Sequence, residues 1–174
     1  MRQTKKITVS GIVVALGVVL MTLGSLFSIV DLTVCALSSL LVAFIYIEIG
    51  SPYTFLVWIC TSLCSALIFP GSPVWVEYLL IFGIYPILKA YIERLPRGWW
   101  WILKLAFINA DVWLIAIISE LVTGVKFFGE ENFIFNVVLY VIINVAFIAY
   151  DVFMTILIRF YVVKLQPTFK RFLK

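Results

Sequence analysis

The sequence predicts an all-α integral membrane protein, a single bundle of six transmembrane helices formed by one domain, residues 1–174, with both termini in the cytosol. Composition is the first reason: 64% of the 174 residues are hydrophobic and 13% are charged, and the mean hydropathy is +1.17. Soluble chains are about 45–50% apolar, and a domain of this size has too little interior to bury more. The composition therefore excludes a soluble enzyme, a disordered chain and a nucleic-acid-binding domain.

The first three helices follow from apolar runs of the length that crosses a bilayer, about 20 residues. The run 7–30 follows the basic residues Arg2, Lys5 and Lys6. It is too long for the apolar part of a signal peptide, and no small-residue cleavage site follows it, so we expect a retained helix. The next two helices are expected at 32–49 and 53–69, separated by Gly50-Ser51-Pro52 and ended by Pro70-Gly71-Ser72-Pro73.

The last three helices are predicted in the same way. The run 74–92 ends at the charged loop 93–98. Pro86 lies inside this run and is expected to kink the helix near Phe82, because proline leaves the carbonyl one turn earlier without its donor. The fifth helix is expected at 99–124 and the sixth at 133–163, and the end of the sixth is expected to protrude into the cytosol.

Charge predicts the orientation of the six helices. With the amino terminus in the cytosol, twelve of the thirteen Lys and Arg residues lie in inner segments or their flanking helix ends, and Lys126 alone lies outside. Such an excess is typical of cytosolic loops. The sequence therefore predicts a multi-pass protein of the plasma membrane. The net charge of +4 suits anionic lipid headgroups, and no nucleic-acid partner is expected.

The sequence gives little support for catalytic residues or metal-binding sites. Histidine is absent, which excludes histidine-based proteases and histidine metal sites. Cys60 and Cys64 are one helical turn apart in an apolar run, and we interpret them as small core residues in preference to a soft-metal pair. We expect no enzyme activity, no catalytic residue, no metal and no cofactor.

Small residues favour close helix packing in the first half of the chain. In the first helix, Gly11, Ala15, Gly17 and Gly24 are expected along one half of the helix surface. Thr61 and Ser65 give the third helix a similar packing face. Two interpretations of the first helix stay open: packing within the bundle, or docking of another membrane protein through Gly11 and Ala15.

Polar residues in the last three helices predict a different role, because ionisable groups inside a membrane are costly and mark function by default. Lys104 and Asp111 are seven residues apart and share a helix face, and Asp151 ends a similar face on the sixth helix. We expect Lys89 or Lys104 to neutralise Asp151. The other polar residues either form a structural network or surround a small solute. The predicted solute-binding residues are Asp31, Trp75, Glu77, Tyr78, Asn109, Asp111, Glu120, Asn136 and Asn144.

Together these features resemble the S components of energy-coupling-factor transporters, small bacterial six-helix proteins that bind vitamins or metal ions. The resemblance rests on topology, on the Gly11–Ala15 pair, on the Gly50-Ser51-Pro52 turn and on polar residues in the last three helices. The chain departs from the family in having Gly11 where alanine is usual, and in a glycine-poor third helix. No signature of a particular vitamin is present.

The resemblance implies a substrate-binding subunit that delivers its solute to a separate membrane partner with ATPases, with Gly11 and Ala15 facing that partner. Two other functions stay open. One is a non-catalytic scaffold or assembly subunit of a cell-envelope complex, which would not need Asp111 in the middle of the membrane. The other is a stand-alone small carrier.

Overall fold

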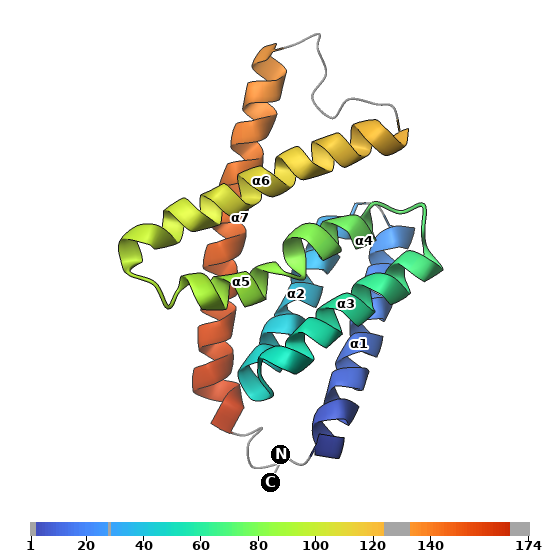
Figure 1. The fold of residues 1–174 in the computed structure, drawn as a ribbon, viewed down its shortest axis with the longest axis vertical. Helices are drawn as coiled ribbons and strands as arrows, with labels where there is room; N and C mark the ends of the chain where they lie inside the picture. Colours follow the sequence, from blue (N-terminus) through green and yellow to red (C-terminus); the bar gives the residue numbers. More distant parts are fainter. Residues whose placement is uncertain (1–2, 28, 124–132, 168–174) are drawn as a thin grey trace. The chain divides into compact units, whose positions relative to one another are not determined.

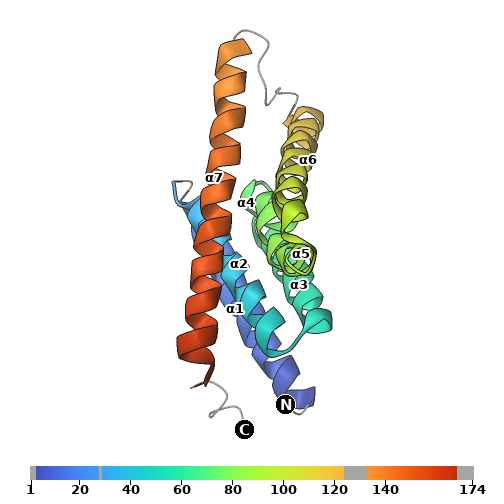
Figure 2. The same ribbon diagram turned by 90° about the vertical axis from the view of Figure 1, so that its left-hand side faces the viewer.

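The computed structural model describes residues 3–27, 29–123 and 133–167, with the backbone alone over 119–123. Within these ranges the chain forms helices and turns and no strand. Six of the described helices are long and apolar enough to span a membrane, which confirms the predicted all-α class and helix count (Figures 1 and 2). They are α1 Gln3–Leu26, α2 Asp31–Glu48, α3 Ser51–Ile68, the fourth span Val74–Ile92, α6 Arg97–Thr123, and α7 Phe133–Phe160 continued by η2 Tyr161–Leu165.

Local signals explain where the early helices begin. The Asp31 carboxylate accepts a hydrogen bond from the Leu32 amide at 2.6 Å, and an acid in the first turn also favours the helix dipole. Gly50 has φ +105°, a backbone conformation that glycine adopts without strain. Pro52 follows in the first turn of α3, where its missing N–H is not needed. Each helix lies within four residues of its predicted ends.

Contacts within the chain define two compact units, each described here by itself: residues 1–91 with 154–174, and residues 92–153. The prediction of one domain, residues 1–174, stays a prediction. In the first unit α1 packs against α2 and α3, α2 packs against α3, and α4 contacts all three. The larger buried cluster of this unit contains Met21, Val34, Cys35, Val42, Val74, Tyr78 and Ile87.

The small residues of α1 divide between two faces, which corrects the prediction that they lie along one half of the helix. Gly17 and Gly24 are buried, and a Cβ on Gly17 would lie 2.9 Å from Thr61 Cγ2. Gly11 and Ala15 are exposed. Gly11 and Gly17 are six residues apart, which is about one and two-thirds turns at 3.6 residues per turn, and the two therefore point in different directions.

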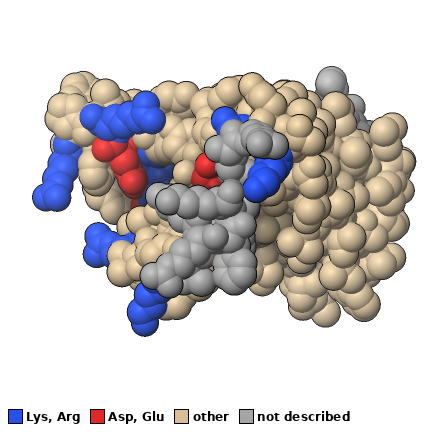
Figure 3. Space-filling view, turned by 90° about the horizontal axis from the view of Figure 1, so that it is seen from below, with Lys and Arg blue, Asp and Glu red and all other residues tan. Residues whose placement is uncertain are grey.

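The beginning of α1 and the end of the described chain lie at the same end of the first unit. The Tyr53 hydroxyl donates to Gln3 Oε1 at 2.6 Å, and the Tyr161 hydroxyl donates to Glu48 Oε1 at 2.9 Å. Glu48 ends α2 just before α3 begins, so these contacts lie at the same end. Figure 3 views the molecule from below, with Lys and Arg side chains in blue.

The fourth span is interrupted. It consists of α4 Val74–Glu77, the π-helical turn η1 Tyr78–Phe82, and α5 Tyr85–Ile92. Gly83 N donates to Tyr78 O at 2.7 Å, and Pro86 has no N–H to offer Phe82. The expected disturbance near Phe82 is confirmed, and it is a break of the helix instead of a simple kink.

Trp58 of α3 supports the interruption. Its indole N–H donates to the carbonyl of Leu79 at 3.1 Å, so an α3 side chain binds a backbone acceptor of η1. The same ring lies against Gly83, where an added Cβ would overlap it. Glycine at position 83 therefore leaves the space that the indole occupies.

In the second unit α6 crosses the first part of α7 (Figure 1). Lys104 of α6 contacts Asp151 of α7, and Asn109 contacts Asn144. Residue numbers rise along α6 while those of their α7 partners fall, so the helices run antiparallel. This crossing brings the polar face of α6 against the polar face of α7, as the seven-residue spacings predict.

Candidate functional site

The predicted solute-binding residues belong to two units. Asp31, Trp75, Glu77 and Tyr78 lie in the first unit, and Asn109, Asp111, Asn136 and Asn144 lie in the second. The side chain of Glu120 is outside the described residues. That all nine surround one solute stays a prediction, and each group is considered within its own unit.

The first unit contains a cavity of about 430 Å³ at the end opposite to Gln3 and Glu48. Its volume falls within the range of small-molecule sites, about 300–1,000 Å³. Asp31 is among the lining residues, and Ile68 at the end of α3 with the turn 69–73 supplies much of the wall. Trp75 is anchored beside this turn, because its indole N–H donates to the carbonyl of Pro70 at 3.3 Å.

Glu77 and Tyr78 lie three and four residues after the cavity wall residue Val74. Oε2 of Glu77 is buried and has no hydrogen-bond partner within the part of the chain that the structure describes. The Tyr78 side chain is 1% exposed, so it forms part of the packed interior. This end of the first unit thus combines a cavity, lined in part by Asp31, with the buried carboxyl group of Glu77.

The first unit contains buried hydroxyl groups that the expectations from the sequence did not include. The side-chain oxygens of Ser10, Ser38 and Ser65 are buried, and the described residues offer them no hydrogen-bond partner. By contrast, Ser62 donates to the carbonyl of Trp58 one turn earlier, at 2.9 Å. Thr61 and Ser65 were expected only to pack. Buried polar groups without partners are unusual, and the available signal was the repetition of Ser and Thr in apolar helices.

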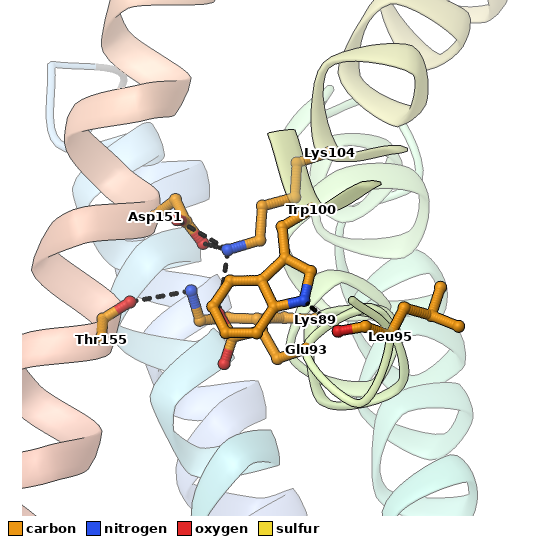
Figure 4. A network of polar contacts seen from close by, with 7 residues as sticks. All are labelled: Lys89, Glu93, Leu95, Trp100, Lys104, Asp151 and Thr155. Atoms are coloured by element: carbon orange, nitrogen blue, oxygen red, sulfur yellow. Dashed lines mark hydrogen bonds and ion pairs between the residues drawn. The ribbon is translucent and has the colours of Figure 1, made fainter. Parts of the chain in front are cut away.

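Lys104 is the centre of a buried ion cluster in the second unit (Figure 4). Its Nζ donates to both carboxylate oxygens of Asp151, at 3.0 and 2.9 Å, and to Glu93 Oε1 at 2.9 Å. Lys104 and Asp151 are each 3% exposed. The rings of Trp100 and Trp101 lie 5.9 and 5.5 Å from Nζ. Lys104, one of the two lysines considered for Asp151, makes an ion pair with it.

Lys89 has its own hydrogen bond within the first unit. Its Nζ donates to Thr155 Oγ1 at 2.8 Å (Figure 4), and its side chain is buried. The Thr155 hydroxyl is a neutral acceptor, and this hydrogen bond orients the ammonium group of Lys89 inside a membrane-spanning helix.

An amide pair and a carboxyl group extend the polar face of the second unit. Asn144 Nδ2 donates to Asn109 Oδ1 at 3.1 Å and to the Tyr140 carbonyl at 3.0 Å. Asp111 is 8% exposed, and its Oδ2 has no hydrogen-bond partner within the described ranges. Asn136 is half-buried. The face therefore contains paired charges, a paired amide and one carboxyl oxygen without a donor.

Two further predictions concern the cysteines and the exposed face of α1. Cys60 is exposed and Cys64 half-buried, so Cys60 does not make the core contact expected of it. Over the described ranges, no three His, Cys, Asp or Glu side chains are grouped as metal ligands. A Cβ added to Gly11 would meet nothing within 4 Å, so this part of α1 can receive a closely packed helix.

Comparisons with protein-family models, with curated proteins and with solved structures gave no match.

Proposed function

We propose that this chain is a membrane subunit that binds a small solute at the outer surface and passes it to a separate membrane partner driven by ATPases. The cavity of the first unit, with Asp31 in its wall, is the observation that carries the proposal. This is the role of the S components that the sequence resembles. The chain itself supplies binding groups and no catalytic residue.

The interrupted fourth span supports a binding role. Irregular backbone at membrane depth is tolerated where protein surrounds it or where it lines a cavity, and broken helices often form transporter binding sites. Here α4 supplies Val74 to the cavity wall, and η1 follows one turn later. A structural scaffold would gain nothing from an interruption that weakens helix hydrogen bonding.

In this proposal both termini lie in the cytosol and the cavity opens to the outside. Two observations support this orientation: the basic residues predicted for the inner face, and the contacts Tyr53–Gln3 and Tyr161–Glu48, which bring the two ends of the described chain to one end of the first unit. The cavity lies at the opposite end.

The exposed pair Gly11 and Ala15 is the proposed docking surface for the membrane partner. Small side chains allow two helix backbones to approach closely in lipid. Gly17 and Gly24 already serve such contacts within the unit, which leaves the Gly11–Ala15 pair for an external helix.

Mass spectrometry of small molecules retained by the purified protein tests the binding role. The chain is extracted from its native membrane in mild detergent, together with Asp31→Asn and Glu77→Gln. Glu48→Gln is the matched control, because it removes a carboxylate at the other end of the same unit. Loss of a charged hydrogen bond is worth about 1.5–3 kcal/mol, so we expect about tenfold or greater loss of retained solute in Asp31→Asn and Glu77→Gln. An empty wild-type protein, or equal retention by all four proteins, would contradict the proposal.

A further inference from the structure

Asp111 is an isolated carboxyl group in the middle of a membrane-spanning helix. It lies fourteen residues after Arg97, the first residue of α6, or about 21 Å along the helix axis. A span that enters the bilayer at Arg97 places this position inside the hydrocarbon core, which is about 30 Å thick. Asp111 is 8% exposed, and its Oδ2 is buried.

The neighbouring polar groups of the second unit are already engaged. Lys104 is two turns earlier on the same helix face and is held by Asp151 and Glu93 at 2.9–3.0 Å. Arg94 and Arg97 lie near the beginning of α6 and are exposed. Both N–H groups of the Asn144 amide are used, one by Asn109 and one by the Tyr140 carbonyl. None of these groups supplies a donor to Oδ2.

The protonated form of Asp111 is the one that this environment favours. A charge that enters an apolar interior without a partner costs several kcal/mol, whereas a neutral polar group costs about 1–3 kcal/mol. A carboxylate that accepts few hydrogen bonds also loses the stabilisation that such bonds give its ionised form. A bound metal cation would need several oxygen ligands. Among the described side chains of the second unit, Oδ2 of Asp111 is the buried atom that lacks a partner.

We propose that Asp111 is a proton-binding site inside the membrane. One proton from water forms an O–H bond at Oδ2 and leaves the carboxyl group neutral, and the same proton returns to water on release. The site belongs to α6 in the second unit and does not depend on the solute cavity of the first unit. The Asp111 carboxyl group is then a group inside the bilayer whose charge changes with pH.

Infrared difference spectroscopy tests the proposal on the full chain in lipid nanodiscs. The carbonyl stretch of a protonated carboxylic acid is separated from that of a carboxylate. We expect this band in the wild-type protein at neutral pH, its loss as the pH rises, and its absence in Asp111→Asn. Asp111→Glu keeps a titratable group and is expected to retain a shifted band. A spectrum that Asp111→Asn leaves unchanged would overturn the proposal.

Labelling with dicyclohexylcarbodiimide gives an independent measurement. The O–H of a protonated carboxyl group adds across a C=N bond of this apolar reagent, and peptide mass spectrometry locates the adduct. We expect an adduct on Asp111 that declines with rising pH and is the same in sodium and potassium salts. Asp151, which is ion-paired to Lys104, is the internal control and should stay unlabelled. Protection of Asp111 by sodium alone would indicate a metal cation in place of the proton and overturn the proposal.

Discussion

Replacement of Lys104 by methionine removes the ammonium group of the ion cluster and keeps much of the apolar stem. In the native protein Nζ makes contacts of 2.9–3.0 Å with Asp151 and Glu93, and Lys104 and Asp151 are each 3% exposed. Removal of one partner from a buried ion pair costs about 3–5 kcal/mol, because the other charge stays buried. We expect Lys104→Met to lower the free energy of unfolding by at least about 3 kcal/mol.

A double-mutant cycle separates the ion pair from packing. Asp151→Leu alone should cost a similar amount, because it leaves the ammonium without its main counter-charge. Lys104→Met combined with Asp151→Leu should recover most of the loss, since apolar replacement of a buried ion pair is often close to neutral. Glu93→Gln is the control: Glu93 is 32% exposed, and a partly solvated pair of this kind is worth about 1 kcal/mol or less.

The assay is reversible unfolding of the purified chain in mixed micelles with increasing sodium dodecyl sulfate. Circular dichroism reports helix content, and tryptophan fluorescence reports on Trp100 and Trp101, whose rings lie 5.9 and 5.5 Å from Nζ. A Lys104→Met protein within about 0.5 kcal/mol of wild type, the range of ordinary surface substitutions, would refute the reasoning. So would a double variant that loses the sum of the two single losses.

Three further predictions follow from the packing and from the cavity. Gly83→Ala should lower the free energy of unfolding by about 1–3 kcal/mol, since its Cβ overlaps Trp58 and overpacking costs this much. Gly11→Ala, measured by the same titration, should have a free energy of unfolding within about 0.5 kcal/mol of wild type. Gly11→Leu should abolish co-purification of the membrane partner and spare solute retention and stability. Gly17→Leu should instead destabilise the chain itself, because Thr61 Cγ2 lies 2.9 Å from the position of the added Cβ. Equal partner recovery by Gly11→Leu and wild type would exclude the docking role. Trp75→Ala should reduce retained solute in mass spectrometry while Trp99→Ala does not, and equal retention by both would make Trp75 an interfacial anchor.

The sequence predicts the six helices well because their physical cause is local. Long apolar runs separated by charge, Gly and Pro can satisfy their backbone in lipid only as helices. Pro86 also marks the disturbance of the fourth span, since the missing N–H is a property of the residue. The π-helical turn Tyr78–Phe82 was not predictable, because it depends on Trp58 and Gly83, which meet only when α3 packs on this span.

The candidate site was predicted less completely because its contacts depend on tertiary packing. Spacing placed Lys104 and Asp151 on polar faces, but the contact between the two side chains required the crossing of α6 and α7. The lack of a hydrogen-bond partner at Ser38 and Ser65 was not predicted, because a serine in a helix often bonds the carbonyl one turn earlier, as Ser62 does. Their partnerless oxygens become evident only in the packed structure.

Affinity purification from native membranes, with mass spectrometry of the co-purifying proteins, tests the central claim most directly. The wild-type chain should recover one membrane partner together with ATPases, and a small molecule should accompany the complex. Recovery of cell-envelope synthesis proteins, with no bound small molecule, would contradict the account and identify the chain as a scaffold.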